Sequence, residues 1–326
     1  MKREGWPTFS FTDVLRPPEG WKAEHAILTT YSADLVVIVT ALLSLTDCDL
    51  DHRRTGSRVE LVKAIEALRG RVRILAQANR VAVPKTPRPI LKLLDQFLTA
   101  VDTNENESSW HPKVALVRYQ RIEDATERHW RVWIGSRNLT HAMNWDAGLI
   151  LTSCADGRGQ SVDGLAALGA ALAGRAKLAT LNADDVASEL AALTWECPPG
   201  CKVQKISLFG PDLARGFPKP PRDTEHVLVV SPFLDSNSVR AVASWGNQKT
   251  RRTLVSTALE LQRLWQDNGG VFSEFSNVCV LPFPELAVEG VDLFDEEASG
   301  AMETAESEDL PPAGLHAKLY FAAKGA

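Results

Sequence analysis

Two short stretches of the sequence carry the same pair of residues, a histidine and, two positions later, a lysine. The first is His111-Pro112-Lys113 and the second is His316-Ala317-Lys318. Residues two apart in a strand point to the same face, so we expect each histidine to lie beside a fixed cation. One imidazole can attack phosphorus while the other protonates the leaving oxygen, and two ammonium groups can neutralise the phosphate oxygens. Together the two pairs indicate chemistry on a phosphodiester.

A further polar cluster, Gly135-Ser136-Arg137-Asn138, follows the first pair at the end of an apolar run. An asparagine amide can donate a hydrogen bond to a phosphate oxygen, and a serine can support it through its hydroxyl or backbone N–H. Alone, this composition is that of an ordinary turn. With His111 and Lys113 upstream, we expect Ser136 and Asn138 to belong to the same site.

This combination of His-x-Lys and Gly-Ser-x-Asn resembles the signature of the phospholipase D superfamily, which usually contains it twice. The resemblance implies a phosphodiesterase that works without a metal ion or cofactor and forms a phosphohistidine intermediate. By analogy with the tyrosyl-DNA phosphodiesterase branch, it assigns His111 as nucleophile and His316 as general acid. Lys113 and Lys318 would then neutralise the phosphate.

The sequence departs from the family pattern in two places. The phospholipase-type motif has an aspartate five positions after the lysine, where this chain has Arg118, and this makes the first copy more similar to the tyrosyl-DNA phosphodiesterase branch. After the second copy the sequence ends at Ala326, before any Gly-Ser-x-Asn. Truncation of a longer protein and a degenerate nucleic-acid-binding module are both consistent with that ending.

Three other residues near the first motif have competing interpretations. Asp146 could orient a catalytic histidine, or it could be a surface or capping carboxylate. His129 and His141 have no lysine partner, so we predict that both are structural.

Several elements must position these residues. We predict a buried strand over residues 35–41, a helix over 59–68 and a strand over 71–76, which together make a β-α-β unit. A helix over 89–101 and a loop lead to the first motif strand, and a hairpin at 120–128 returns as a strand over 129–134. Further along we predict a strand at 148–151, helices within 162–193, strands at 226–233, 253–256, 276–281 and 314–322, and a helix at 238–245.

The pattern is that of an α/β fold. The resemblance implies two similar phospholipase D-like halves, each a mixed sheet flanked by helices, with the active site at the seam between them. Proline and glycine interrupt regular structure between residues 198 and 221. We therefore assign residues 1–198 to a first half with the complete motif and residues 199–326 to a second half with the truncated one.

The charge of the chain is unevenly distributed. The total is −5, but no lysine or arginine stands between Arg263 and Lys318, where there are 12 acidic residues. Residues 1–263 hold 34 basic and 29 acidic side chains, a net of +5, so a polyanionic partner is compatible with the body of the protein. The acidic stretch 284–312 is interpreted either as a solvated loop or as a cover that competes with nucleic acid.

The composition places the protein in a reducing, aqueous compartment. Its five cysteines are odd in number and mostly scattered, which is typical of free thiols, and Cys197 with Cys201 reads as a turn rather than as metal ligands. The N-terminus lacks the apolar run of a signal peptide, and the longest such run, 35–43, is too short to span a bilayer. We expect a cytoplasmic protein with no membrane association.

The leading hypothesis is a metal-independent phosphodiesterase that cleaves nucleic acid, DNA rather than RNA, as a nuclease or DNA-end processing enzyme. The resemblance also implies further domains or a helicase or other ATPase as partner, within a bacterial defence or repair system. A lipid phosphodiesterase is the alternative among enzymes. Fold resemblance does not decide between the substrates.

Overall fold

The computed structural model describes residues 10–46, 58–84, 89–104, 108–142, 144–154, 157–199, 202–208, 220, 222–281 and 314–324. Within them the chain forms a mixed α/β fold that divides into two units. The first unit comprises residues 1–134, 138–141 and 148–214, and the second comprises residues 135–137, 142–147 and 215–326. Ser136 is thus assigned to the second unit and Asn138 to the first.

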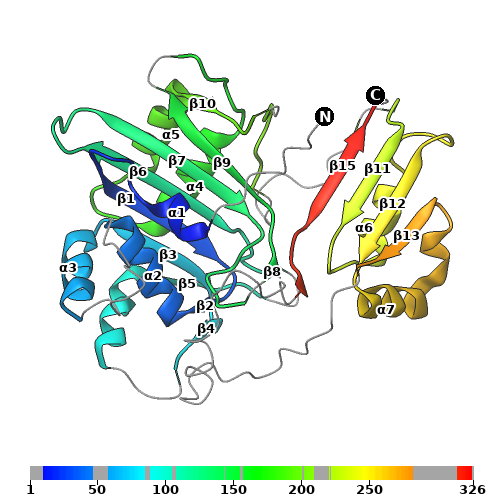
Figure 1. Ribbon diagram of the computed structural model, residues 1–326, viewed down its shortest axis with the longest axis horizontal. Coiled ribbons are helices and arrows are strands. Elements are labelled where there is room, and N and C mark those ends of the chain that lie inside the picture. The colour runs from blue at the N-terminus through cyan, green and yellow to red at the C-terminus, as the bar shows by residue number, and fades with distance from the viewer. Residues whose placement is uncertain are drawn as a thin grey trace. The chain divides into compact units, whose positions relative to one another are not determined.

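A seven-stranded sheet forms the centre of the first unit, in the order β10-β9-β7-β6-β1-β3-β5 (Figure 1). Its strands are β1 (Trp21–Thr30), β3 (Val72–Gln77), β5 (Leu98–Val101), β6 (Val114–Arg121), β7 (Arg128–Gly135), β9 (Gly148–Cys154) and β10 (Thr194–Glu196). Strands β1, β3 and β5 are parallel, and β6 is antiparallel to both β1 and β7. The start of β6 therefore lies beside the carboxyl end of β1, where Leu28 pairs with Ala115.

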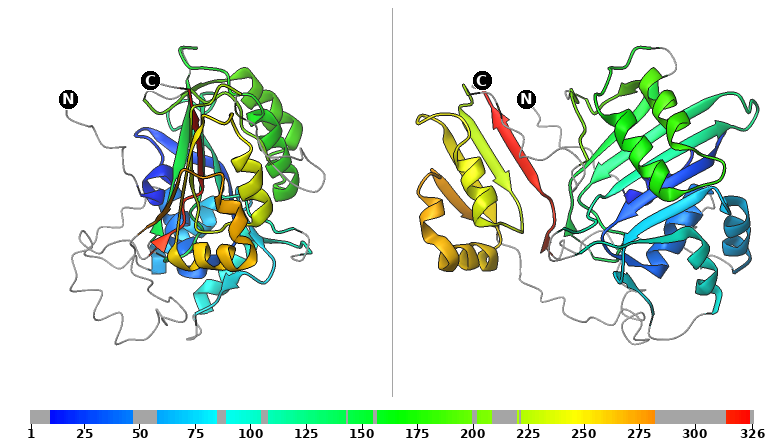
Figure 2. Two further views of the ribbon diagram at one scale, coloured as in Figure 1. Left: turned by 90° about the vertical axis from the view of Figure 1, so that its right-hand side faces the viewer. Right: turned by 180° about the vertical axis from the view of Figure 1, so that it is seen from behind.

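Both faces of this sheet are covered by helices. One face packs against α1 (Phe11–Leu15), α2 (Leu35–Leu45), α3 (Arg58–Leu68) and the 3-10 helix η1 (Pro89–Phe97). The other packs against α4 (Leu165–Ala176) and α5 (Ala183–Ala192), which lie over the strands when the molecule is seen from behind (Figure 2). Along β1, Ala26 and Leu28 enter the first core and Ile27 enters the second, as period-2 alternation requires.

The prediction of a buried strand over residues 35–41 is wrong, because this segment begins helix α2. Leu35, Ile38, Leu42 and Leu45 recur at helical spacing and are all buried. The run is apolar nearly all round, so its composition alone does not separate a buried strand from a buried helix. The β-α-β unit exists, but its first strand is β1, which pairs in parallel with β3.

The helix predicted over residues 89–101 is also partly wrong. The 3-10 helix η1 ends at Phe97, and Leu98–Val101 forms β5 along the edge of β3. Sheet pairing outweighs the helical pattern at this point, since Ile74 and Leu98 are in register in a parallel ladder. The other predicted elements of the first unit, from α3 to α5, are confirmed.

A four-stranded sheet forms the second unit, in the order β13-β12-β11-β15. Its elements are β11 (His226–Val230), α6 (Ser236–Ala243), β12 (Arg251–Ser256), α7 (Ala258–Asn268), the 3-10 helix η2 (Gly269–Phe272), β13 (Asn277–Val280) and β15 (Leu319–Ala323). The strand predicted over 314–322 is divided into β14 (Gly314–Leu315) and β15, with the second His-x-Lys between them. Two-residue strands pair β14 with β8 (Asn144–Trp145), and β2 (Ala33–Asp34) with β4 (Val81–Ala82).

The second sheet repeats part of the strand order of the first. In the first unit β1, β3 and β5 are parallel neighbours, with antiparallel β6 beside β1. In the second unit β11, β12 and β13 are parallel neighbours, with antiparallel β15 beside β11. A His-x-Lys stands immediately before the antiparallel strand in each unit, so the two motifs occupy equivalent places in the two folds.

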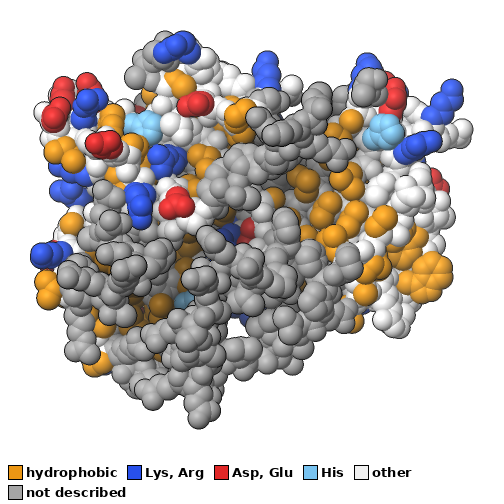
Figure 3. Space-filling view, in the orientation of Figure 1, with side chains coloured by type: hydrophobic (Ala, Val, Ile, Leu, Met, Phe, Trp, Pro, Cys, Tyr) orange, Lys and Arg blue, Asp and Glu red, His pale blue; other side chains and the backbone are white. Residues whose placement is uncertain are grey.

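The two sheets differ in how they are covered. In the described part of the second unit, α6, α7 and η2 pack on the face formed by Val227, Val229 and Leu254. Leu228 pairs with Phe321 on the opposite face, where no described helix packs, and Phe321 is exposed. Figure 3 shows apolar side chains gathered over the strands of this unit.

Some sequence predictions fall outside the described residues. These are the N-terminal segment 1–9, Cys48, Cys201 and the whole of the acidic stretch 284–312. Cys197 is described, and its sulfur accepts a hydrogen bond from the Gln160 side chain. Among the described residues, no helix is long and apolar enough to cross a membrane.

Candidate active site

His111 is exposed at the carboxyl edge of the first sheet, on a backbone that is held on both sides. Before it, Trp110 is buried and its N–H donates to the Gln77 side chain at 2.7 Å. After it, the Thr29 hydroxyl donates to the Pro112 carbonyl at 2.9 Å and accepts from the Val114 N–H at 2.8 Å. The motif therefore has a fixed backbone although it precedes the strand.

Lys113 is buried, and its ammonium lies against the ring of His111. The Nζ atom is 2.9 Å from His111 Nδ1 and 3.3 Å from the His111 carbonyl oxygen. The two side chains therefore lie side by side, as predicted. The reason is not strand alternation, however, because β6 begins only at Val114, after both residues. Because an ammonium can only donate, Nδ1 of His111 is the acceptor in this contact.

Tyr31 lies beside this motif, and Asn138 lies beside Tyr31. The Tyr31 ring packs against the His111 ring, with 4.9 Å between the centroids. The Asn138 amide oxygen lies 3.3 Å from the Tyr31 N–H and 3.4 Å from the Thr30 hydroxyl. A backbone N–H can only donate, so the amide atom of Asn138 that faces Tyr31 is its oxygen. The NH₂ group of Asn138 then points the other way, where it can act as a hydrogen-bond donor.

His316 in the second unit has a different partner, because its Nδ1 atom lies 2.9 Å from a carboxylate oxygen of Asp146. Parallel pairing of β14 with β8 brings the two together, since Leu315 is in register with Trp145. The Ser136 hydroxyl donates to the same Asp146 oxygen at 2.6 Å and accepts from the Ala147 N–H at 3.0 Å. Ser136 thus acts on the histidine through Asp146.

Electrostatics keep Asp146 ionised. Burial raises the pKa of its carboxyl, but hydrogen bonds from His316 and Ser136, with the nearby charges of His316 and Arg137, lower the pKa below its usual range. Arg137 approaches the second carboxylate oxygen at 3.6 Å. When the ring is neutral, a carboxylate at Nδ1 holds the proton there, so that Nε2 presents its lone pair.

Lys318 follows His316 and lies in a partly desolvated place. Burial lowers the pKa of its ammonium, and the negative charge of Asp146 opposes part of that effect. Its Nζ atom is 5.1 Å from the centroid of the Phe233 ring.

Within the described residues, no group of three or more His, Cys, Asp or Glu side chains could hold a metal ion.

Arg118, at the position where the phospholipase-type motif has aspartate, belongs to a separate buried network. It lies 3.0 Å from Glu24 and 2.7 Å from Glu189, and one of its nitrogens is 3.1 Å from Nδ1 of His25. Asp124 is exposed in the hairpin turn, where it accepts hydrogen bonds from Thr126.

The two histidines predicted to be structural have structural partners. His141 lies 3.0 Å from Asp34 through Nδ1, and its backbone N–H donates to the same carboxylate. Burial and the charge of Arg131 lower the pKa of His129 to about 4, and its ring lies 3.3 Å from the Ser153 hydroxyl.

Sequence reasoning missed Thr29, Tyr31 and Phe233. The first two lie at the end of β1, the strand that was itself not predicted, and Phe233 lies just beyond β11. The useful signal would have been position, since residues that follow the first parallel strand of an open α/β sheet lie at its ligand-binding edge.

No protein-family model matches the chain, and no curated protein matches it either. The fold is similar to solved structures of yeast tyrosyl-DNA phosphodiesterase. A histidine-to-asparagine variant is 9% identical with a TM-score of 0.43, and the match covers 82% of this chain and 69% of that one. Another structure of the yeast protein is 11% identical with a TM-score of 0.40, covering 95% and 75% of the two chains. With such low identities and TM-scores, the function has to be argued from the residues of the site.

Proposed function

We propose that this protein hydrolyses phosphodiester bonds of nucleic acid through a phosphohistidine, without a metal ion. The observation that carries the proposal is the equivalent placement of His111 with Lys113 and of His316 with Lys318, each at the start of the antiparallel strand beside the first parallel strand of its unit. Ordinary surface histidines have no reason to recur at equivalent positions with a lysine two residues later. Phosphodiesters need a nucleophile, a proton donor and cations, and these four side chains supply all three.

The hydrogen bonds of the two rings favour His316 as the nucleophile, the reverse of the order that the resemblance implies. Asp146 holds the proton on Nδ1 of His316, so the Nε2 lone pair can form a bond to phosphorus. Nδ1 of His111 instead accepts a hydrogen bond from the Lys113 ammonium. His111 then takes the proton-transfer role.

The proposed reaction has two steps. His316 Nε2 attacks phosphorus, the bond from phosphorus to the leaving oxygen breaks, and protonated His111 gives its proton to that oxygen. Water then attacks the phosphohistidine, neutral His111 accepts its proton, and the phosphorus–nitrogen bond breaks to regenerate His316. Lys113, Lys318 and the NH₂ group of Asn138 neutralise the phosphate oxygens, and the Lys113 ammonium leaves Nδ1 of His111 when it binds them.

Nucleic acid is proposed as substrate because of the charge of the chain. Residues 1–263 have a net charge of +5, and phosphate-rich polyanions are attracted by such an excess. Within this proposal DNA is favoured over RNA. A lipid ester is the less favoured substrate.

The test compares cleavage by the unsubstituted protein, His111→Ala and His316→Ala, all with EDTA present. Single- and double-stranded DNA, RNA and phosphatidylcholine serve as parallel substrates. We expect EDTA-resistant cleavage of nucleic acid that both substitutions abolish. His226→Ala is the matched control, because His226 is exposed on β11 without a lysine two residues later.

Four results would contradict the proposal. Cleavage that requires a divalent ion would remove the phosphohistidine mechanism, and cleavage that survives both substitutions would remove the site. Binding of nucleic acid with no cleavage would identify a binding module instead of an enzyme. Turnover of phosphatidylcholine alone would move the substrate to lipids.

A further inference from the structure

Phe233 is an exposed aromatic residue beside the second His-x-Lys. The residue is 62% exposed, although Lys318 lies over its ring with Nζ 5.1 Å from the centroid. The first unit has an aromatic residue, Tyr31, directly after β1, but its ring packs on His111 and lies under Arg80 at 5.3 Å. The Phe233 ring thus remains accessible where the Tyr31 ring is occupied by protein groups.

The position of Phe233 is the ligand-binding edge of the second sheet. Phe233 follows the carboxyl end of β11, and β11, β12 and β13 are parallel. Open α/β sheets bind ligands outside the carboxyl ends of such strands. Val230 is in register with Leu319, which places the start of β15, and with it Lys318, at the same edge.

The backbone that carries Phe233 is fixed from both sides. The Ser231 hydroxyl donates to the Phe233 carbonyl at 2.6 Å and accepts from its N–H at 3.3 Å. The next residue, Leu234, donates its N–H to Glu260 and accepts a hydrogen bond from Arg263. Because the backbone of Phe233 is fixed by these hydrogen bonds while its side chain is exposed to solvent, the ring is preorganised for contact with a ligand.

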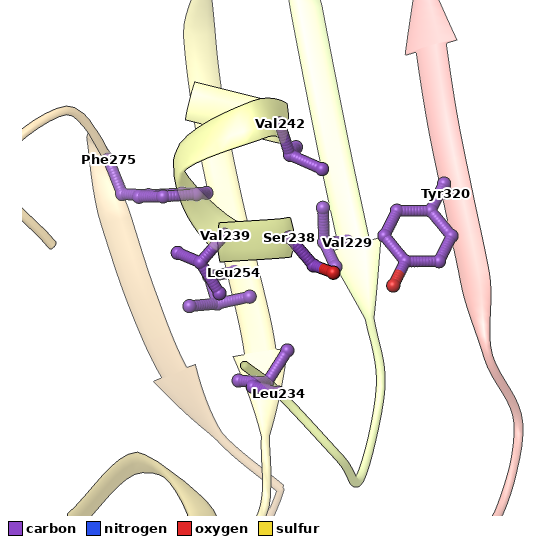
Figure 4. A pocket seen from close by; sticks show the side chains of 8 residues that line it. All are labelled: Val229, Leu234, Ser238, Val239, Val242, Leu254, Phe275 and Tyr320. Carbon is purple, nitrogen blue, oxygen red and sulfur yellow. The ribbon is translucent and has the colours of Figure 1, made fainter. Parts of the chain in front are cut away.

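The neighbouring side chain anchors the same loop from inside. Leu234 is only 5% exposed and lies in the apolar interior with Val239 and Leu254 (Figure 4). Since Leu234 is committed to this core, Phe233 cannot exchange places with it. The exposure of Phe233 is therefore imposed by the packing of the loop.

We infer that Phe233 is a base-stacking residue that binds the nucleobase next to the phosphate held by Lys318. A flat uncharged ring beside an ammonium group matches the two parts of a nucleotide, because every base offers a π-face and every linkage a negative charge. The inference rests on the proposed function for the phosphate at Lys318, and it adds a preference for strands whose bases are unstacked. A quaternary ammonium headgroup could also approach an aromatic face, but the Lys318 cation already lies over this ring.

The test measures dissociation constants of short fluorescent single-stranded DNA in a His111→Ala background, so that turnover does not interfere. One oligonucleotide carries all its bases and the other is abasic throughout, with the same length and charge. We expect Phe233→Ala to weaken binding of the base-bearing strand roughly 5- to 30-fold and to leave the abasic strand nearly unchanged. Phe233→Trp should retain affinity.

Trp265→Ala is the matched control. Trp265 is 63% exposed in the same unit, but its ring stacks on Phe272 and it is not part of either His-x-Lys. Its substitution should change neither affinity. A loss of affinity in this variant equal to that of Phe233→Ala would mean that exposed aromatic surface in general is responsible.

Other outcomes would overturn the inference. An unchanged affinity in Phe233→Ala would do so, as would an equal loss for base-bearing and abasic strands, because stacking requires the base. If Phe233→Ala impaired hydrolysis of a phosphocholine ester instead, the ring would serve a lipid headgroup. Because binding is measured without turnover, a failure of stacking is distinguishable from a failure of catalysis, which would appear as an absence of cleavage by the unsubstituted protein.

Discussion

The two motif histidines have unlike neighbours, and their proposed roles rest on this difference. His316 is held by a carboxylate that itself accepts a hydrogen bond from Ser136. His111 lies against an ammonium and an aromatic ring. The identity of both His-x-Lys pairs could be read from the sequence, but the partner of each ring depends on contacts between residues up to 170 positions apart.

Replacing Asp146 tests the positioning of His316. In Asp146→Asn the ring loses the charge that fixes its proton on Nδ1, so we expect kcat to fall about 10- to 100-fold with little change in KM. Steady-state kinetics on an oligonucleotide substrate measure this. Asp124→Asn, an exposed hairpin carboxylate, is the control and should behave like the unsubstituted protein. An Asp146→Asn variant with full activity would show that His316 needs no such partner.

The lowered pKa of Lys318 leads us to expect that activity declines at alkaline pH. Burial lowers the pKa of Lys318 below its usual value of 10.5, so its positive charge is lost as the pH rises through a range in which an exposed lysine would still be charged. We expect phosphate binding, measured as kcat/KM, to decline in that range. Lys318→Arg should move the decline to higher pH, because a guanidinium stays protonated. A decline at the same pH in both proteins would assign it to another group.

At the scale of secondary-structure elements, the ends of strands position each His-x-Lys motif. Both motifs precede an antiparallel strand that begins beside the carboxyl end of the first parallel strand. The hairpin of β6 and β7 and the helices α4 and α5 were predictable from alternation and helical spacing. The apolar run that forms α2 was not, because periodicity does not distinguish two buried alternatives, and β1 was missed with the residues at its end.

The buried network of Arg118 makes the stability of the first unit depend on pH. Burial, followed by the charge of Arg118, lowers the pKa of His25 to about 4. In the unfolded chain His25 is protonated below about pH 6.5, whereas in the folded protein it stays neutral down to about pH 4. The free energy of unfolding therefore falls as the pH drops from 6.5 toward 4. His25→Gln, which does not titrate, should reduce this loss by about 1 to 2 kcal/mol, allowing for screening by solvent.

Urea unfolding of both proteins at pH 7 and at several lower values measures the effect. His129 contributes a loss of the same sign in both proteins, so only the difference between them reports on His25. Parallel curves for the two proteins would mean that the network does not exclude the charged form of His25.

At the scale of the whole molecule, the main feature is the uneven distribution of charge along the chain. The net charge of +5 over residues 1–263 contrasts with the acidic residues that follow. Whether the two units correspond to functional halves stays a prediction, as does the role of the acidic stretch. The role of the acidic stretch could be proposed from the sequence because net charge needs no coordinates, and the two halves from the resemblance and the interruptions between residues 198 and 221. The assignment of residues 135–137 and 142–147 to the second unit could not.

Deleting residues 288–309 removes nine acidic side chains. If this stretch competes with nucleic acid, affinity for DNA should rise roughly 3- to 10-fold at low salt, with a smaller gain at high salt because charges are screened. Fluorescence anisotropy across a salt series measures this. Replacing the same residues with an equally long Gly/Ser segment separates the loss of charge from the change in length. Unchanged affinity in both proteins would dispose of the competition.

Trapping the covalent intermediate tests the central claim most directly. With thymidine 3′-(p-nitrophenyl phosphate), the leaving group needs no protonation, so His111→Ala should still form the phosphohistidine but hydrolyse it slowly. Mass spectrometry at alkaline pH, where phosphohistidine survives, should then find thymidine phosphate attached to His316. No adduct on His316, despite release of p-nitrophenolate, would contradict the account.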